Sequence, residues 1–260
     1  HFCRQPDHPR QGCCPHAPSV TPMNKPLNSQ GRIHLIDDIR GLTIISMMGF
    51  HVCYDLAYLY ALPMDWFTIG PFQDIWRCSI SWTFLFLAGW STSFSRNNLK
   101  RGLLYSAMAL LVWIATSVAG VDTPVNYGIL FCMGASTLLF TCLEKIKTPN
   151  PLLMTILALA AFFLTYQIPR TAYPIEHLAW LGFPSPTFMS GDYYPLLPYF
   201  FMYIVGAECA RLFNEKTGEY PYWATKKWSR LLEWIGTKSL VIYLIHQPLA
   251  LLALELIFGS

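Results

Sequence analysis

Charged residues are scarce in this sequence. Only 13% of the 260 residues are Asp, Glu, Lys or Arg, whereas 53% are hydrophobic and 15% aromatic, and ordinary soluble domains carry roughly a quarter charged residues. The net charge of +3 is too small to indicate a nucleic-acid partner. A soluble fold would struggle to bury this many long apolar runs. The composition therefore excludes an ordinary soluble domain and predicts an integral membrane protein.

Three familiar sequence patterns are also missing. No signal-peptide pattern precedes the first apolar run, so we expect that run to remain as an uncleaved anchor. The cysteines in and beside the apolar runs show no CxxC or Cys/His ligand spacing, so we expect them to pack in the bundle and expect no metal there. No repeat of fixed period occurs, which argues against a transporter built from two similar halves.

The first 31 residues differ in character from the rest. Cys3, Cys13 and Cys14 lie in a leader that contains Pro and His but has no apolar periodicity. A metal-binding tail is one interpretation, since Cys and His bind soft divalent metals. We favour the other, in which residues 1–31 are a disordered or artefactual leader followed by a cytoplasmic lead-in. Residues 32–260 are then a single transmembrane domain.

Seven apolar runs are each long enough, or nearly long enough, to cross a bilayer, which takes about 20 mainly apolar residues. The sequence therefore predicts an all-α, polytopic transmembrane helix bundle with about seven spans. The runs cover approximately residues 41–60, 75–95, 102–120, 125–143, 151–168, 195–213 and 235–258.

Basic residues alternate between the connecting loops. Three loops are rich in Lys and Arg, and by the positive-inside rule they are cytoplasmic. This places the N-terminus in the cytoplasm and the C-terminus outside. The basic residues are Arg96, Lys100 and Arg101 in one loop, Lys145 and Lys147 in the next, and Lys216, Lys226, Lys227 and Arg230 in the third.

The first apolar run carries ionisable side chains along one helical face, at spacings of three and four residues. His51 lies roughly 16 Å along the helix axis from Arg40, near the middle of the hydrocarbon layer. An ionisable side chain at this depth is costly and requires a buried partner or a function. The face contains Asp37, Arg40, Ile44, Met48, His51 and Asp55.

The last run carries a second intramembrane histidine. Ser239, Tyr243 and His246 share one face, and Pro248 is expected to kink the helix just beyond them. His246 lies roughly 12 Å from Lys238 along the axis, at a depth similar to that of His51. The matched depths predict that both histidines line one cavity. The alternative is that each makes an interhelical hydrogen bond that holds the bundle together.

The residues alone leave open the roles of Asp55 and of the pair formed by Asp37 and Arg40. Asp55 either fixes the tautomer of His51 through a hydrogen bond or only reaches the outer interface. Asp37 and Arg40 either form an anchoring ion pair or position Arg40 to hold an anionic ligand, helped by the basic loop that contains Arg96, Lys100 and Arg101. The long connection 169–194 has the aromatic and acidic composition of a sugar site, and interfacial aromatic belts have the same composition.

The sequence from Asp37 to Gly41, with His51 eleven residues after Arg40, resembles the first-helix signature of integral-membrane acyltransferases. Four further stretches resemble the bacterial branch related to the heparan-α-glucosaminide N-acetyltransferase catalytic domain. The resemblance runs from about residue 32 to the C-terminus. The four stretches are residues 84–89, 128–134, 191–198 and 239–248.

The sequence departs from that family at specific positions. The lysosomal enzyme of the family has an asparagine where His51 stands, and its proposed catalytic histidine lies in the loop after the first helix. The corresponding loop here, residues 61–74, contains no histidine. Many bacterial relatives also have a histidine near Phe131, which this chain lacks. Heparan sulfate itself is therefore not the expected substrate.

The resemblance implies an acyltransferase of the bacterial inner membrane, with acetyl-CoA or another acyl-CoA as donor. The implied acceptor is a hydroxyl or amine of an extracytoplasmic glycan or amino sugar. We expect His51 to be the base or a transient acyl carrier, Asp55 to support it, and His246 and Tyr243 to stabilise the oxyanion. Arg40, Asp37, Arg96, Lys100 and Arg101 are the expected donor-binding residues.

Two other functions remain as alternatives. One is a small transporter or flippase-like protein whose intramembrane histidines relay protons. The other is a scaffold subunit in which buried polar groups only fix helix packing. The acceptor, the acyl chain length and the formation of a homo-oligomer are left open by the sequence.

Overall fold

The computed structural model describes residues 33–120, 123–143, 150–217 and 220–259, without the side chains of residues 216 and 217. Gly31 to Ser260 form one compact unit. The described residues contain helices, turns and loops and no strand. The expected leader 1–31, with its three cysteines, lies outside the described residues, as do Lys145 and Lys147 and the side chain of Lys216.

The helices follow the order of the apolar runs. The longer ones are α1 (His34–Tyr54), α3 (Phe72–Trp90), α4 (Asn98–Ala119), α5 (Ile129–Leu143), α6 (Pro151–Thr165), α7 (Leu196–Thr217) and α10 (Ser239–Phe258). The shorter ones are η2 (Asp55–Leu59), α2 (Asp65–Thr68), η3 (Ser91–Ser93), η4 (Ile168–Arg170), α8 (Tyr222–Thr225) and α9 (Arg230–Thr237).

The all-α prediction is confirmed for the described residues. Five helical segments there are long and apolar enough to cross a membrane, and α5 is a shorter apolar helix. The count of seven spans and the orientation of the termini stay predictions. The five segments are His34–Leu59, Asn98–Ala119, Pro151–Arg170, Leu196–Glu215 and Ser239–Phe258.

Local sequence signals explain several helix boundaries. The Asn97 side chain accepts a hydrogen bond from the backbone N–H of Lys100 at 2.8 Å and so caps the N-terminus of α4. Asn150 caps α6 in the same way and is followed by Pro151, a residue that suits the first helical position. These two caps fix the ends of helices whose interiors have almost no polar residues.

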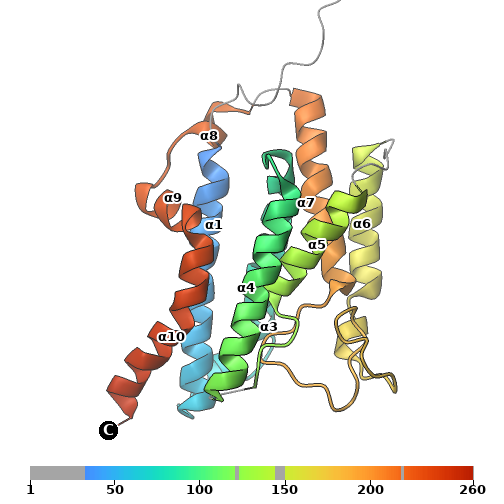
Figure 1. Ribbon diagram of the computed structural model, residues 1–260. Helices are drawn as coiled ribbons and strands as arrows, with labels where there is room; N and C mark the ends of the chain where they lie inside the picture. The colour runs from blue at the N-terminus through green and yellow to red at the C-terminus, as the bar shows by residue number, and fades with distance from the viewer. Residues whose placement is uncertain (1–32, 121–122, 144–149, 218–219, 260) are drawn as a thin grey trace, which may run out of the picture. The chain divides into compact units, whose positions relative to one another are not determined.

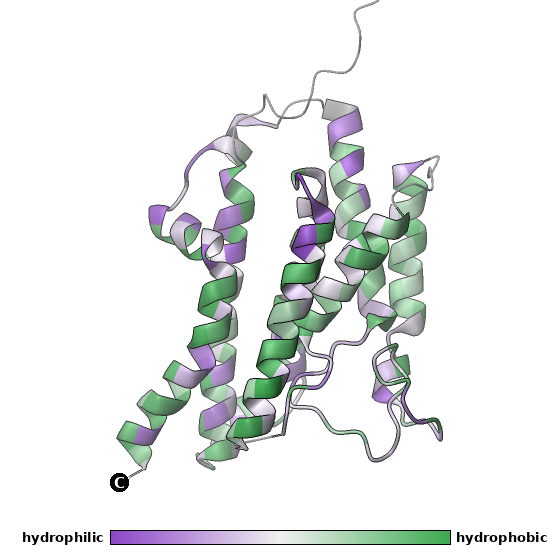
Figure 2. Cartoon of the chain, in the orientation of Figure 1, coloured by the Kyte–Doolittle hydropathy of each residue, from purple (hydrophilic) through white to green (hydrophobic). Residues whose placement is uncertain are grey.

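The helices pack in pairs, with α4 against α5, α3 against α7, and α6 against α7. On the other side of the bundle α1 packs against α3, α9 and α10 (Figure 1). Hydrophobic residues cover most of α4, α5, α6 and α10 (Figure 2). Such a distribution suits helices whose outer surfaces face lipid.

Glycines allow two of these pairs to approach backbone to backbone. A Cβ added at Gly89 of α3 would collide with the carbonyl oxygen of Tyr203, and one at Gly206 of α7 would collide with that of Phe86. The same reciprocal arrangement joins α1 to α9 through Gly41 and Gly236. Small residues at such contacts are typical of helices that associate within membranes.

The last predicted run is not a single helix. It was expected to extend over residues 235–258, but the chain leaves helical geometry at Lys238, which separates α9 from α10. The contact of Gly236 with the backbone of Asp37 holds α9 against α1, so α9 does not continue in line with α10. Beyond this break α10 contains Pro248 and bends along its length (Figure 1).

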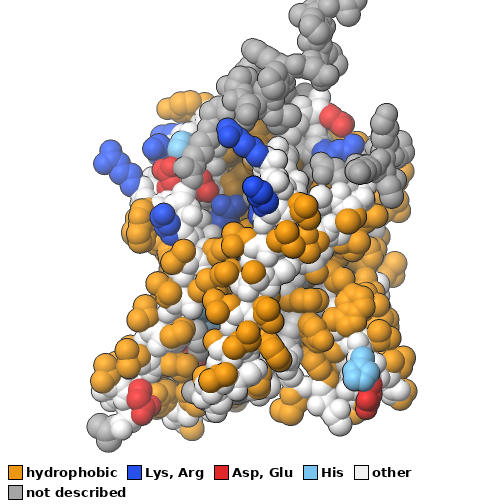
Figure 3. Space-filling view, viewed as in Figure 1, with side chains coloured by type: hydrophobic (Ala, Val, Ile, Leu, Met, Phe, Trp, Pro, Cys, Tyr) orange, Lys and Arg blue, Asp and Glu red, His pale blue; other side chains and the backbone are white. Residues whose placement is uncertain are grey.

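Basic side chains gather at one end of the bundle. In Figure 3 the Lys and Arg side chains cluster around α8, α9 and the start of α4, and hydrophobic side chains cover most of the face below them. The loop that contains Arg96 and Lys100 and the segment that contains Lys226, Lys227 and Arg230 therefore lie at the same end. This agrees with their predicted common side of the membrane.

Candidate active site

Two histidines from opposite ends of the sequence meet inside the bundle. The ring centroids of His51 on α1 and His246 on α10 are 5.1 Å apart. His246 is buried, with 7% of its surface exposed, and His51 is half-buried. The two rings are thus neighbours, at the matched depth that the sequence indicated. Neither histidine is among the residues that line the two cavities described below, so the prediction that both line one cavity stays a prediction. Their roles remain proposals.

Hydrogen bonding defines which ring nitrogens are available. Nδ1 of His246 lies 2.6 Å from the carbonyl oxygen of Tyr243, and because a carbonyl only accepts, Nδ1 carries the proton. Nε2 of His246 is then a lone-pair nitrogen, buried and without a partner among the described residues. The ring of His51 makes no hydrogen bond within the same part of the chain. Each ring therefore has at least one nitrogen that no described residue engages.

Asp55 has a partner that the sequence did not indicate. The side-chain amide of Gln247 donates to both carboxylate oxygens of Asp55, at 2.9 and 3.2 Å. A hydrogen bond from His51 was one of the two alternatives for Asp55, and the described contacts of His51 do not include Asp55. A signal was present, because Gln247 is a polar residue directly after His246 in an otherwise apolar helix. The amide joins α1 to α10 beside the histidine pair.

The backbone changes geometry at this point of α1. Asp55 is the first residue of η2, a π-helical segment that continues α1 after Tyr54. Because a π-helical segment adds a residue to the turn, it shifts the direction of the side chains on either side of it. Such segments occur frequently at functional sites. Here it accompanies the burial of Asp55 in the membrane-spanning part of the chain.

Arg40 is held in place by two side chains. Its guanidinium donates to Oδ1 of Asp37 at 3.1 Å and to Oγ of Ser91 at 2.9 Å. Ser91 begins η3 directly after α3, so these bonds fix Arg40 between α1 and the end of α3. The predicted pair of Asp37 and Arg40 is present. Ser91 was missed because its position next to Arg40 depends on tertiary packing.

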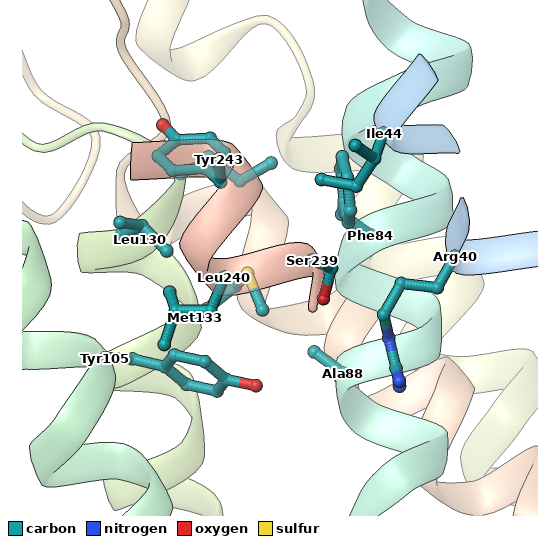
Figure 4. Close-up of a pocket in the computed structure, with 11 residues that line it drawn as sticks. Arg40, Ile44, Phe84, Ala88, Tyr105, Leu130, Met133, Ser239, Leu240 and Tyr243 are labelled. Carbon is teal, nitrogen blue, oxygen red and sulfur yellow. The ribbon is translucent and has the colours of Figure 1, made fainter. Parts of the chain in front are cut away.

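Arg40 lines a small cavity between α1, α3, α4, α5 and α10. Figure 4 shows Arg40 and Tyr105 on opposite walls of this Arg40 cavity, with Ser239 between them. Its volume is about 50 Å³. The lining residues are Arg40, Ile44, Phe84, Ala88, Tyr105, Ile129, Leu130, Met133, Ser239, Leu240 and Tyr243.

A larger cavity of about 430 Å³ lies beside it, and we refer to it as the Trp113 cavity. Both cavities contact Leu130 and Tyr243. The ring of Tyr243 is 5.7 Å from that of His246, and its hydroxyl makes no hydrogen bond within the described chain. The Trp113 cavity is lined by Ser106, Ala109, Leu110, Val112, Trp113, Val125, Asn126, Tyr127, Gly128, Leu130, Phe131 and Tyr243.

The other predicted donor-binding residues have different positions. Arg101 donates to the carbonyl of Ala88 and to the hydroxyl of Tyr203, so its side chain joins α4 to α3 and α7. Arg96 and Lys100 are exposed and line neither cavity. Of the five predicted donor-binding residues, Arg40 and its partner Asp37 thus lie at the Arg40 cavity. Arg101 lies behind the cavity wall, and Arg96 and Lys100 lie at the surface.

Asp192, in the connection before α7, organises the edge of the Trp113 cavity. Its Oδ2 accepts a hydrogen bond from the backbone N–H of Ile129, at the start of α5, at 3.0 Å. Burial raises the pKa of Asp192 to about 6, although this hydrogen bond and the charge of Arg77 both oppose the rise. The carboxyl group is therefore protonated in mildly acidic solution and charged at neutral pH.

This raised pKa predicts a dependence of stability on pH. Because the folded protein binds the proton of Asp192 more tightly than the unfolded chain, its contribution to stability is present below about pH 4 and is lost as pH rises through about 6. Asp192→Asn keeps an oxygen acceptor but has no charge. We expect it to remove this part of the pH dependence and to raise the melting temperature at pH 7.5 relative to wild type.

The measurement is the melting temperature of both proteins between pH 5 and 7.5. The difference between the two curves isolates Asp192 from the other titrating groups. A constant difference across this range would show that Asp192 does not titrate there.

Comparison with known proteins bears on this site. The described residues contain no group of three or more His, Cys, Asp or Glu side chains placed to hold a metal. Searches of curated proteins and of solved structures give no match. A family model described as heparan-alpha-glucosaminide N-acetyltransferase, catalytic, matches residues 32–248, and these include His51, Asp55 and His246.

Two conclusions follow from this match. The match and the apolar helices together indicate an integral membrane protein with an acetyltransferase-like function. Since the match covers most of the chain, the protein belongs to the family of the heparan-alpha-glucosaminide N-acetyltransferase catalytic domain.

Proposed function

We propose that the protein is an integral-membrane acyltransferase that uses a cytosolic acyl-CoA, such as acetyl-CoA, as donor. The acyl group goes to a hydroxyl or amine of a glycan-type acceptor on the other side of the membrane. The observation that carries the proposal is the histidine pair, His51 and His246, with an unpartnered buried nitrogen beside Tyr243. Tyr243 is shared by a cavity that begins at Arg40 and by a second, larger cavity.

His51 acts as the base in this proposal. It takes the proton of the acceptor hydroxyl or amine as the oxygen or nitrogen attacks the thioester carbonyl. The carbon–sulfur bond then breaks, and the proton passes from His51 to the departing CoA sulfur. The ring of His246 lies 5.1 Å from that of His51, and in this proposal its unprotonated Nε2 stabilises His51 while His51 is protonated.

The tautomer of His246 bears on its expected role in stabilising the oxyanion. A ring nitrogen without a proton cannot donate a hydrogen bond, so in this state Nε2 of His246 cannot stabilise an oxyanion. Tyr243 can, because its hydroxyl makes no hydrogen bond within the described part of the chain, and the residue lines both cavities. Direct transfer and transfer through an acyl group on His51 both fit this arrangement.

The donor side is the basic end of the bundle. Arg40 is fixed by Asp37 and Ser91 and faces the cavity, as a residue that binds an anionic phosphate requires. The Arg40 cavity, at about 50 Å³, is smaller than the roughly 300 Å³ of small ligand sites. We therefore expect its walls to move apart when an acyl-CoA binds.

CoA binding tests the donor assignment. Arg40→Gln removes the charge that holds the phosphate, and a hydrogen bond to a charged group is worth about 1.5–3 kcal/mol. We therefore expect about a 10- to 100-fold higher Kd for CoA. The measurement is the thermal stabilisation of the purified protein by increasing CoA.

Arg230→Gln is the matched control for this experiment. Arg230 is exposed, lies at the same basic end and lines neither cavity, so its replacement is expected to leave the Kd unchanged. Equal affinity in the wild type and the Arg40 variant would remove Arg40 from the donor site. No stabilisation of the wild type by CoA would favour the transporter or flippase-like alternative.

A further inference from the structure

The Trp113 cavity lies within the membrane-spanning part of α4. Its α4 residues run from Ser106 to Trp113, roughly 12 to 22 Å along a helix that begins at Asn98. The segment Asn98–Ala119 is one of the candidate spans. The cavity is therefore at the depth of the hydrocarbon layer, which is about 30 Å thick.

One side of this cavity has exposed apolar side chains. Leu110 and Trp113 line it and are also 56% and 45% exposed. The two helices that flank this side have few buried residues, since only 6% of the α4 span and 11% of the α10 span are buried. The main helix neighbours of α10 are α1 and α9. In a spanning bundle, an exposed side between α4 and α10 faces lipid.

Hydrogen bonds close the end of the cavity that lies beyond α4. The side chain of Asn126 accepts a hydrogen bond from the indole of Trp113 at 3.0 Å and donates one to the carbonyl of Met189 at 3.0 Å. The backbone N–H of Asn126 donates to Ser190, and that of Tyr194 donates to the carbonyl of Tyr127. The two loops are thus held together by hydrogen bonds at this end, whereas on the α4 side the apolar cavity residue Leu110 is exposed.

The interior of the cavity suits a polar group with an apolar attachment. Aromatic rings of Trp113, Tyr127 and Phe131 form much of its wall, and rings of this kind can stack on a sugar. The hydroxyls of Tyr243 and Ser106 make no hydrogen bond among the described residues. Its volume of about 430 Å³ falls in the range of about 300–1,000 Å³ that is usual for small-molecule sites.

We propose that the acceptor is anchored in the membrane by a hydrocarbon chain. Its polar head enters the Trp113 cavity sideways, between α4 and α10, and its chain stays in the bilayer along the exposed side of α4. The head then reaches Tyr243 and the histidine pair, where its amine or hydroxyl attacks the thioester as described above. This inference deepens the proposed acyltransferase function and rests on it.

A chain-length series tests the inference directly. The probes are methyl, octyl and dodecyl β-D-glucosaminide, which share one head with an amine and hydroxyls and differ only in the alkyl chain. The protein is assayed in lipid nanodiscs with radiolabelled acetyl-CoA, and the product is the acetylated glucosaminide. We expect the dodecyl compound to be acetylated at least about 10-fold faster than the methyl compound, because each buried CH₂ strengthens retention in the bilayer.

A pair of matched variants separates binding in the cavity from simple enrichment in the bilayer. Ala109 lines the Trp113 cavity, whereas Ala107, two residues earlier on α4, is exposed and does not. Ala109→Trp is expected to reduce acetylation of the dodecyl probe at least about 10-fold, because the indole fills the space that the head requires. Ala107→Trp is expected to retain it. Both are expected to keep stabilisation by CoA, which also shows that they fold.

The outcomes distinguish this inference from the proposed function. Equal rates with the methyl and dodecyl probes would overturn membrane anchoring, and equal rates in the two tryptophan variants would overturn binding of the head in the Trp113 cavity. Either result would overturn the inference and leave acyl transfer in place. Loss of CoA stabilisation in Ala109→Trp alone, with its melting temperature unchanged, would assign the Trp113 cavity to the donor and overturn the inference. Absence of both CoA stabilisation and acetylation of every probe by wild type would overturn the proposed function.

Discussion

Replacing His51 with alanine is expected to lower the rate of acyl transfer by about 10²- to 10⁴-fold, the usual contribution of a positioned general base. The described contacts of His51 are ring contacts with His246 and Phe50. No described side chain is hydrogen-bonded to His51 that could act as the base once the imidazole is removed, so the rate is expected to fall. The variant is expected to fold, since His51 makes no hydrogen bond within the described chain. The measurement is the transfer of label from radiolabelled acetyl-CoA to a cell-envelope extract.

The control for this variant is another histidine. His177 is exposed and lies in the connection before α7, so His177→Ala is expected to retain wild-type transfer. Comparison of the two variants removes any general effect of losing an imidazole. Full activity in His51→Ala, at equal amounts of folded protein, would remove His51 from the chemistry.

A single methyl group at Gly89 is expected to destabilise the bundle by about 3 kcal/mol, the upper part of the range for overpacking. The added Cβ would collide with the carbonyl oxygen of Tyr203, which is backbone and cannot rotate away. The reciprocal change Gly206→Ala meets the carbonyl of Phe86, and we expect a similar effect. The measurement is the melting temperature of each variant in detergent, together with its yield as monodisperse protein.

Gly49 provides a matched substitution. A Cβ at Gly49 would lie 3.7 Å from the ring of Trp76, which is an ordinary contact. Gly49→Ala is therefore expected to melt close to wild type, and helix propensity favours alanine by up to about 1 kcal/mol. If Gly89→Ala and Gly49→Ala melted at the same temperature, the close approach of α3 and α7 would be wrong.

Hydropathy predicted the elements of this fold well because a membrane allows few backbone structures. Each of the seven apolar runs overlaps one of the longer helices. The break at Lys238 was not predicted, although the polar residues Thr237, Lys238 and Ser239 interrupt the apolar run there. The direction of α9 was not readable from the sequence, since it depends on the contact of Gly236 with α1. The π-helical segment at Asp55 was missed for a similar reason, because helical periodicity assumes a regular turn.

The sequence predicted those parts of the site that follow from the depth of a residue in the membrane. His51 and His246 were matched by counting residues from the membrane boundary, and their rings are indeed neighbours. The partner of Asp55 was not predictable in this way, because periodicity shows which residues share a face but not which helix packs against that face. The Trp113 cavity was not predicted from the sequence, since three helices and the loop between α4 and α5 contribute to it.

A structure of the protein in a lipid nanodisc with acetyl-CoA bound tests the central claim most directly. The account predicts that the CoA phosphates contact Arg40 and that the thioester carbonyl lies beside Tyr243, within hydrogen-bonding reach of its hydroxyl and next to the His51 ring. A thioester bound away from the histidine pair would contradict the account. So would CoA phosphates at the end of the bundle opposite Arg40.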